Sequence, residues 1–409
     1  MSLLLKNISR LYTPDVAAGY GQVAEKEKVH LLIEAGRIAA IYDSERELQG
    51  IQADAQLDLS GKTVLPGFID AHTHPVFWKT REDEFIMRVQ GKSYEEIAAA
   101  GGGIRNSVRA FRQASKEAIK EVTRERIHPF LTFGVTTIEA KSGYGLSTED
   151  EIKALEIINE LNAEQPLDLV PTFLGAHEVP DEYQNDRQAY VDLVCNEMIP
   201  LVAERKLAKY CDVFCEEGVF TVEESRKILT TAQKYGLAAR IHADELSPFG
   251  GAELAAEIGA VTADHLVQIS DEGIHALAAA SVIPILLPGT TFFLGKERYA
   301  PARKMIDAGC EVAISTDFNP GSSTTQNFQL MWTIAALKLK MLPEELLWAS
   351  TYIPAKSLGL QDTLGSVEVG KQADLIVLDI PNLNYLPYHY GLNHTLMTIK
   401  AGKVVYSAV

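Results

Sequence analysis

The chain is poor in cysteine and has no long apolar run. Its 409 residues include only four cysteines, Cys195, Cys211, Cys215 and Cys310. Cys211 and Cys215 lie in an apolar segment that indicates a buried strand, so we interpret the thiols as structural rather than metal-binding or redox-active. No apolar run approaches the roughly 18 residues of a membrane-spanning helix, and the first residues do not predict a signal peptide. These absences argue against a disulfide-held or membrane-inserted protein and lead us to expect a reducing, cytoplasmic setting.

The chain is also short of positive charge. It has 38 Lys and Arg residues against 55 Asp and Glu residues, a formal net charge of −17. Such an acidic surface disfavours nucleic acid and anionic membranes as partners. The apolar fraction of 46% and the charged fraction of 23% are those of an ordinary globular protein.

Both ends of the chain have the pattern of short strands. Near the N-terminus, alternating runs flank an Ala35-Gly36 turn and predict a hairpin. The C-terminal end repeats this texture around Gly402. Because neither end has enough strands for a stable sheet alone, we predict one small β-sandwich domain built from residues 1–62 and 364–409.

The middle of the chain, residues 63–363, alternates strand-like runs with helix-length amphipathic stretches such as 149–161 and 221–235. Eight strand candidates end near Asp70, Glu139, Leu174, Cys215, His242, His265, Leu287 and Asp317. Eight βα units over this length predict an α/β catalytic domain, a (β/α)₈ TIM barrel. The alternative is an open doubly wound sheet, but no Gly-x-Gly-x-x-Gly motif follows the first strand as dinucleotide binding would require.

The first barrel strand ends in two histidines separated by one residue, in the run Pro66-Gly67-Phe68-Ile69-Asp70-Ala71-His72-Thr73-His74. Residues i and i+2 of an extended strand project from the same face, so His72 and His74 point together. Two converging imidazoles supply half of a tetrahedral metal site.

Further polar side chains follow the other predicted strands. Barrel enzymes build their sites at these carboxyl ends. The candidates in chain order are Lys141, Tyr144, His177, Glu216, Glu217, His242, Glu245, His265 and Asp317. A single histidine is more often structural than a ligand, but five of the ten histidines stand at equivalent strand ends, which favours a shared site.

His72, His74, His242 and Asp317 together supply three neutral donors and one carboxylate. Such a set suits a catalytic metal that keeps one position open for water and acidifies it. Glu245, three residues beyond His242, is then placed to carry a proton to a leaving nitrogen; its alternative role is a charge at a helix N-terminus.

His265 and Asp317 complete the predicted catalytic set with Glu245. We expect His265 to orient the water or to hold an outer hydrogen bond, and Asp317 to help receive the proton of the water.

These motifs resemble the amidohydrolase superfamily, whose members are metal-dependent barrels with a small β-domain from both termini. Longer strings resemble its imidazolonepropionase family over nearly the whole chain. They are Gly101-Gly102-Gly103-Ile104, Lys141-Ser142-Gly143-Tyr144-Gly145-Leu146, Phe173-Leu174-Gly175-Ala176-His177, Ile241-His242-Ala243-Asp244-Glu245, Ala263-Asp264-His265-Leu266, Leu287-Pro288-Gly289-Thr290-Thr291-Phe292 and Thr316-Asp317-Phe318-Asn319-Pro320-Gly321-Ser322-Ser323.

The resemblance implies that the chain hydrolyses the cyclic amide of 4-imidazolone-5-propanoate to N-formimidoyl-L-glutamate, a step of histidine degradation, with a metal-activated water. It implies one zinc or iron ion per subunit on the four predicted ligands, and a homodimer. The residues that it places against the substrate are Arg81, Tyr144, His177, Glu245, Asn319, Gly321 and Ser322, with Tyr94 as a weaker candidate and Gly101 to Gly103 as a hinge.

The fourth strand end reads Phe214-Cys215-Glu216-Glu217-Gly218 and lacks the bridging lysine of two-metal relatives. A second metal is therefore disfavoured, although Glu216 stays open as a bridging carboxylate. Two other functions also stay open. One is the deamination of a nucleobase-like ring, and the other is a metal-free scaffold, which the complete ligand set disfavours.

Overall fold

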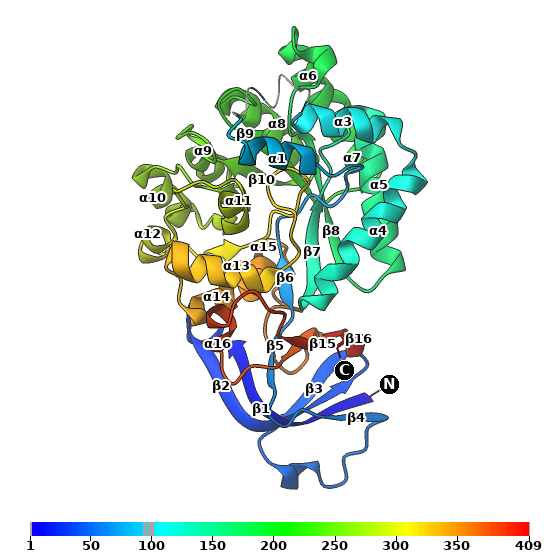
Figure 1. Cartoon of the computed structure of the whole chain (residues 1–409), viewed down its shortest axis with the longest axis vertical. Coiled ribbons are helices and arrows are strands. Elements are labelled where there is room, and N and C mark those ends of the chain that lie inside the picture. Colours follow the sequence, from blue (N-terminus) through cyan, green and yellow to red (C-terminus); the bar gives the residue numbers. More distant parts are fainter. Residues whose placement is uncertain (1, 93–95, 97–101, 409) are drawn as a thin grey trace.

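The chain folds into two separate sheets, which a computed structural model describes for residues 2–92, 96 and 102–408. Both termini lie in the smaller body, at the bottom of Figure 1. Its eight strands are β1 (Ser2–Pro14), β2 (Val23–Glu34), β3 (Arg37–Tyr42), β4 (Ala55–Asp58), β5 (Thr63–Pro66), β14 (Leu375–Leu378), β15 (Thr395–Lys400) and β16 (Lys403–Ser407).

The terminal sheet has the order β16-β15-β14-β5-β1-β2-β3, with β4 beside β1, so strands from the two ends of the chain meet at the β14–β5 pair. Their alternate apolar side chains, among them Leu31, Val64 and Val377, pack into one shared core. The predicted hairpin is confirmed, and its turn residues Ala35 and Gly36 have positive φ angles of 49° and 79°, as a type I′ turn requires.

The larger sheet is a parallel barrel, as the sequence predicted. Its strands, in spatial as well as chain order, are β6 (Phe68–Asp70), β7 (Val135–Lys141), β8 (Asp168–Ala176), β9 (Tyr210–Cys215), β10 (Ala238–Ala243), β11 (Thr262–His265), β12 (Ile283–Leu286) and β13 (Ala313–Ile314). The first and last strands meet just beyond their ends, where Asp317 N–H donates to His72 O at 3.1 Å and His74 N–H donates to Phe318 O at 2.8 Å.

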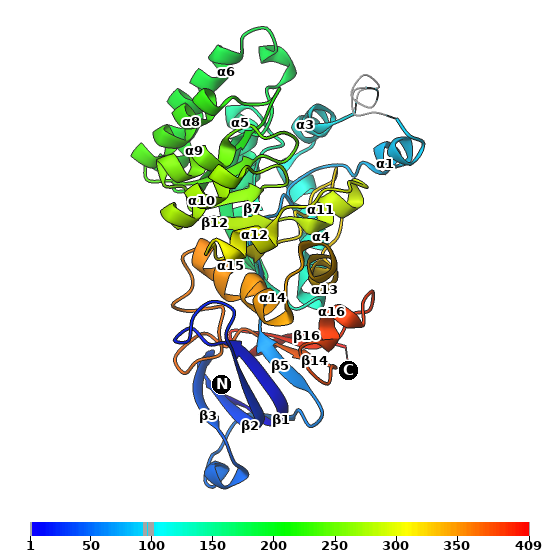
Figure 2. The same cartoon turned by 90° about the vertical axis from the view of Figure 1, so that its left-hand side faces the viewer.

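Helices surround the barrel and cover its strands on the outside (Figures 1 and 2). The α-helices are α1 (Glu82–Val89), α3 (Ile104–Gln113), α4 (Lys116–Thr132), α5 (Thr148–Glu164), α6 (Arg187–Leu193), α7 (Ile199–Glu204), α8 (Val222–Lys234), α9 (Gly251–Ile258), α10 (Asp271–Ala280), α11 (Pro288–Phe293), α12 (Ala302–Asp307), α13 (Phe328–Ile334), α14 (Pro343–Ser350), α15 (Tyr352–Ser357) and α16 (Tyr385–Tyr388). Short 3₁₀ turns span Glu45–Leu48 and Asp181–Tyr183, and π-turns span Val194–Met198 and Ala335–Leu339.

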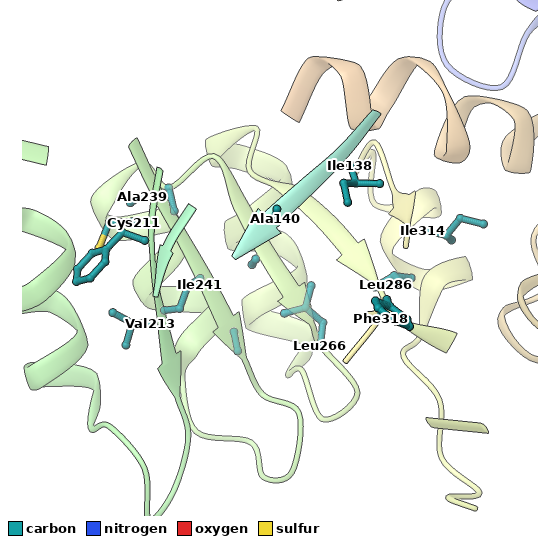
Figure 3. Close-up of a cluster of buried hydrophobic side chains, with 14 of the residues drawn as sticks. Ile138, Ala140, Cys211, Val213, Ala239, Ile241, Leu266, Leu286, Ile314 and Phe318 are labelled. Atoms are coloured by element: carbon teal, nitrogen blue, oxygen red, sulfur yellow. The ribbon is translucent and has the colours of Figure 1, made fainter. Parts of the chain in front are cut away.

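The two faces of the barrel strands differ in chemistry. On the helix-facing side, apolar residues such as Ile138, Val213 and Ile241 pack into the main core (Figure 3). The alternate residues contact each other across the inside of the barrel, and many are charged. Lys141 of β7, for example, lies near Asp264 of β11, four strands away. The strands therefore build an apolar coat around a polar interior.

The strand that the sequence predicted before His72 is divided between the two sheets. Thr63–Pro66 pairs with β1 and β14, and only Phe68–Asp70 belongs to the barrel. The change occurs at Gly67, whose N–H donates to Asp374 O of the terminal sheet while the next N–H, of Phe68, donates to Gly134 O of the barrel. The domain division after residue 62 stays a prediction; sheet membership changes five residues later.

The structure also bears on the predictions about the cysteines and about membrane-spanning helices. All four cysteines are buried and unpaired, and Cys211 and Cys215 lie in β9 as predicted. Within the residues that the structure describes, no helix is long and apolar enough to cross a membrane.

Candidate metal centre

The structure brings the four predicted ligands to one point at the carboxyl end of the barrel. The Nε2 atoms of His72 and His74 are 3.3 Å apart, and those of His74 and His242 are 3.4 Å apart. Asp317 Oδ1 lies 3.5 Å from Nε2 of both His72 and His74. All four side chains are buried.

These separations fit a metal ion. Ligand atoms at 2.0–2.1 Å from a tetrahedral zinc-type ion stand about 3.4 Å from one another. The donor set of three imidazoles and one carboxylate suits zinc or iron. The structure therefore contains a His-rich site with the spacing and chemistry of a metal centre. Two overlapping sets of buried side chains, His72–His74–His242 and His72–His265–Asp317, have ligand atoms that all lie within 4.8 Å of one another.

Carboxylates fix the orientation of two of the imidazoles. Asp264 Oδ2 accepts a hydrogen bond from His72 Nδ1 at 2.6 Å, and Asp212 Oδ1 accepts one from His242 Nδ1 at 3.1 Å. Each interaction places the proton on Nδ1 and leaves Nε2 as a donor for a metal. Sequence reasoning missed both aspartates, although a lone acid within an otherwise apolar strand is a usable signal.

Thr290, a third residue that sequence reasoning missed, holds Asp317. Thr290, in α11, donates its hydroxyl to Asp317 Oδ2 at 2.5 Å, which leaves Oδ1 toward the histidines. The backbone of Asp317 has a φ of 53°, and that of His265 a φ of 74°. Positive φ angles in non-glycine residues are strained, and their occurrence here is typical of functional sites.

Burial is the main influence on the titration of the site. It lowers the pKa of His72 and His74 well below the usual range, which keeps both imidazoles neutral. It also raises the pKa of Asp317 to about 6. For His242 burial works in the same downward direction, but the charge and hydrogen bond of Asp212 outweigh it and raise the pKa.

Glu245 stands beside the four ligands and faces His265. The His265 Nδ1 and Glu245 Oε2 atoms are 3.6 Å apart. Burial, followed by the nearby charge of Asp317, raises the pKa of Glu245 to about 8. The two residues line a pocket of about 300 Å³ together with Thr290, and Lys296 lies at the same pocket. Glu245 can therefore hold a proton near neutral pH within reach of a small bound molecule.

Glu216, left open as a bridging ligand, is occupied by the next loop. Its carboxylate accepts hydrogen bonds from the backbone N–H groups of Glu217, Glu245, Leu246 and Ser247 at 2.8–3.1 Å. With both oxygens turned to these N–H groups, Glu216 shapes the Glu245 loop. This arrangement strengthens the case against a second metal.

Tyr144 and His177 lie together above the ligands. The ring centroids of His177 and His74 are 5.2 Å apart and stacked, and those of His177 and Tyr144 are 5.4 Å apart. His177 Nδ1 donates to Gly143 O at 2.9 Å, and burial lowers the pKa of His177 to about 3. Its Nε2 is thus an acceptor available to a ligand.

Arg81 and Gly321 meet at the rim. Gly321 packs so closely on the Arg81 guanidinium that a Cβ would overlap it. Glu84 Oε2 holds Arg81 through Nε at 2.9 Å and Nη2 at 2.6 Å. The charge of Arg81 opposes the effect of burial on the Tyr144 pKa, which burial raises, so the two groups are within electrostatic reach.

Asn319 and Ser322 lie in the same loop as Gly321. The Asn319 amide donates to Asp317 O at 2.7 Å and Ser322 Oγ at 2.8 Å, and its oxygen accepts from the Gly321 and Ser322 N–H groups. The side chain thus shapes the loop. The predicted substrate contacts of Asn319, Gly321 and Ser322 stay predictions, and Tyr94 and Gly101 lie outside the described residues.

Solved structures with the same fold include deaminases. An adenosine deaminase from Xanthomonas campestris with bound zinc matches with a TM-score of 0.73 at 18% identity, covering 98% of this chain and 92% of that one. The guanine deaminase of E. coli matches with a TM-score of 0.73 at 16% identity over the whole of both chains. At this identity they establish the fold alone.

Sequence comparisons go further. The model of the amidohydrolase family matches residues 63–405. An imidazolonepropionase of Alkaliphilus metalliredigens is 46% identical over 99% of this chain and 98% of its own length, and one of Geobacillus sp. WCH70 is 48% identical over 98% and 97%. This chain therefore belongs to the amidohydrolase family and, within it, to the imidazolonepropionases.

Proposed function

We propose that this chain hydrolyses 4-imidazolone-5-propanoate to N-formimidoyl-L-glutamate, opening a cyclic amide at its C–N bond. The observation that carries the proposal is the convergence of three imidazoles and Asp317, with the nearest pairs within 3.5 Å, beside a protonatable Glu245. The names of relatives 43–50% identical over nearly the full chain supply the substrate.

We assign the metal to His72, His74, His242 and Asp317. When bound, a zinc or iron ion supplies Lewis acidity, which brings the pKa of a coordinated water from about 15.7 towards 7. The chain contributes four buried ligands, of which His72, His242 and Asp317 are oriented by hydrogen bonds.

Glu245 and His265 are the proposed proton carriers. The ionised form of Glu245, which a bound cation would favour, takes one proton from the attacking water. The protonated form, which burial favours, then gives that proton to the ring nitrogen that leaves. His265, 3.6 Å away, keeps that carboxyl oriented and hydrogen-bonds the water. The Asp317 carboxylate helps to receive the second proton of the water.

The substrate has a carboxylate tail and a ring with N–H groups, and the upper side of the site matches both. Arg81, whose Nε and Nη2 donate to Glu84, offers its positive charge and its Nη1 donors to the carboxylate. His177 Nε2 accepts a ring N–H, and the Tyr144 hydroxyl, close to both residues, adds a donor. These contacts orient the amide carbon toward the four ligands.

The direct test uses the purified enzyme and imidazolone propanoate. The ultraviolet absorbance of the ring is followed with and without a chelator, and the product is identified by mass. We expect loss of absorbance, one equivalent of N-formimidoyl-L-glutamate and restoration by added metal after chelation. Release of ammonia would indicate a deaminase instead, and a chain that turns over no substrate with metal bound would refute the assignment.

The same family membership supports three finer proposals: zinc or iron as the ion, a homodimer, and a cytoplasmic location. Four buried, unpaired thiols favour a reducing compartment. Metal analysis of the purified protein and light scattering test the first two, and fractionation of cells tests the third.

A further inference from the structure

Lys141 is a buried cation close to the metal centre, and the proposed reaction does not use it. It ends β7, and its side chain is fully buried. Its Nζ lies 2.6 Å from Asp212 Oδ2, 2.7 Å from Glu139 Oε1 and 3.9 Å from Asp264 Oδ2. One ammonium group thus faces three buried carboxylates, inside a barrel whose interior is usually filled by branched apolar residues.

Two of these carboxylates are the ones that hold metal ligands. Asp212 accepts the hydrogen bond of His242 Nδ1 on Oδ1, and its Oδ2, which contacts Lys141, is also 3.1 Å from that nitrogen. Asp264 uses for His72 the same Oδ2 that faces Lys141. A path of polar contacts therefore runs from one ligand to another through His72, Asp264, Lys141, Asp212 and His242; its longest step, 3.9 Å between Asp264 and Lys141, is an ion pair without a hydrogen bond. It joins residues of β7, β9, β10 and β11 with the end of β6.

The charges show that the carboxylates of this path depend on Lys141. Three buried carboxylates without a cation repel one another, and a buried charge that loses its partner is costly. Arg240, the other buried cation here, is 3.7 Å from Glu139 and spends its Nη atoms on the carbonyls of Ala71 and Ser357. Lys141 is the cation whose hydrogen bond fixes the rotamer of Asp212, and Asp212 in turn fixes the imidazole of His242.

We infer that Lys141 is a positioning residue for the metal centre: it holds Asp212, and within electrostatic reach Asp264, so that His242 and His72 present Nε2 to the ion. The inference goes beyond the proposed reaction and rests on its metal site, not on the identity of the substrate. It assigns to the second barrel strand a part in metal affinity, although that strand supplies no ligand.

The chain offers a matched control. Lys400, in the terminal sheet, is also buried between two aspartates. Its Nζ lies 2.6 Å from Asp168 Oδ2 and donates a hydrogen bond to Asp374 Oδ2. Lys141→Met and Lys400→Met therefore each remove one buried ammonium, the first from three carboxylates and the second from two. A purely structural role predicts that both variants lose thermal stability and that neither loses metal affinity.

The experiment measures Zn²⁺ affinity of the full chain by competition with a chromophoric chelator, alongside the melting temperature of the metal-free forms. We expect Lys141→Met to weaken Zn²⁺ binding about 10- to 100-fold, the usual effect of losing an outer partner of a ligand. Lys400→Met should stay within about threefold of the parent. Equal affinity of the parent and Lys141→Met would overturn the inference, whereas a parent that binds no Zn²⁺ would refute the metal centre itself.

A second variant serves if Lys141→Met does not fold. Asp212→Asn keeps an oxygen for His242 Nδ1 but has no charge for Lys141, so it breaks the path at one contact. We expect Zn²⁺ binding about tenfold weaker or more. Where both variants fold, Lys141→Met should cost less than about threefold in the Asp212→Asn background, because a shared path is not additive. Parent-like affinity of Asp212→Asn, or full additivity, would overturn the inference.

Discussion

At the scale of single residues, each candidate ligand is fixed by a different partner. His72 is held by Asp264, His242 by Asp212 and Asp317 by Thr290. His74 differs, because its Nδ1 has no hydrogen-bond partner among the described residues; its ring stacks on His177, and its backbone N–H donates to Phe318 O. Ligand atoms that are oriented before the ion arrives lose little freedom on binding, which favours affinity and precise placement of the water.

The role of Glu245 is tested by Glu245→Gln. The amide keeps the shape of the side chain but cannot carry a proton, so we expect kcat to fall about 10²- to 10⁴-fold with metal content and fold unchanged. Steady-state kinetics and metal analysis check this. Glu217→Gln, exposed in the loop after β9, is the matched control and should keep parent activity. Near-normal turnover of Glu245→Gln would disprove the proton-carrier role.

The raised pKa of Glu245 also predicts a pH-dependent stability of the metal-free protein. Folding raises the pKa from 4.5 to about 8, so between these values the folded state binds more protons than the unfolded state. Stability from this group is then complete at low pH and is lost as the pH rises toward 8. The variant Glu245→Gln lacks this loss.

We therefore expect metal-free Glu245→Gln to gain on the parent as the pH rises from 5 to 9. The gain should be on the order of a few kcal/mol, or roughly 2–4 °C in melting temperature. Thermal scans at pH 5, 7 and 9 measure it, and saturating metal should reduce it because a cation favours the ionised carboxylate. A gap that is constant with pH would contradict the burial of Glu245.

At the scale of elements, the loops of the site share one construction. A buried carboxylate gathers several backbone N–H groups: Glu216 those of the Glu245 loop, Asp244 those at the start of α9, and Glu151 those of Gly143, Gly145 and Leu146. Such charge-assisted bonds are stronger than neutral ones. They set loops whose own residues, many of them glycines, have little intrinsic preference.

The loop that carries Tyr144 depends on Glu151, in the first turn of α5. We expect Glu151→Gln to raise KM about tenfold with little change in metal affinity, since it weakens charged hydrogen bonds worth about 1.5–3 kcal/mol each in the loop but touches no ligand. Kinetics and chelator competition separate the two effects. Glu149→Gln, an exposed acid of the same helix turn, is the control. Unchanged KM would show that the Tyr144 loop is held by other contacts.

The turn at Gly67 joins the two sheets and leaves no space for a side chain. A Cβ there would lie 2.5 Å from Thr136 Oγ1 and 2.6 Å from Thr136 Cγ2. We expect Gly67→Ala to destabilise the protein by about 1–3 kcal/mol through overpacking, measured by urea unfolding. Thr136→Ala in the same chain removes both atoms and should restore part of the loss. If Gly67→Ala is as stable as the parent, and Thr136→Ala adds no stability to it, the turn at Gly67 is not crowded.

At the scale of the whole molecule, the candidate metal ties distant parts of the chain together. Its four ligands follow β6, end β10 and follow β13, so the ion joins the first, fifth and eighth barrel strands. At the opposite end of the barrel, Lys400 of the terminal sheet pairs with Asp168 at the start of β8. The candidate site thus lies at the carboxyl end of the barrel strands, and the contact with the terminal sheet lies at their amino end.

Metal removal should consequently lower the melting temperature. An ion at about 1,000 times its Kd adds about 4 kcal/mol to the free energy of unfolding. With an unfolding entropy of roughly 2 cal/mol/K per residue, that corresponds to about 5 °C for 409 residues. Thermal scans before and after chelation, and after metal is returned, measure the shift. A melting temperature that chelation leaves unchanged would speak against a site closed by the folded barrel.

The sequence by itself determined the eight barrel strands and the hairpin at Ala35-Gly36, and it predicted the shared site of His72, His74, His242 and Asp317. These follow from local signals: the period of a strand, the chemistry of a turn, and the rule that parallel strands expose their carboxyl ends together. The longer sequence motifs of the strand ends and loops then indicated the family, because motifs of that length are specific to it.

Only the tertiary structure decided which side chains support the site. An apolar run such as Thr63–Pro66 has the same pattern in either sheet, so its place in the terminal sheet depended on pairing with β14. Alternation along β7 and β9 puts Lys141 and Asp212 on the inner face, but not against each other. Their contact crosses the barrel, and its distance is set by closure of all eight strands, which no local pattern contains.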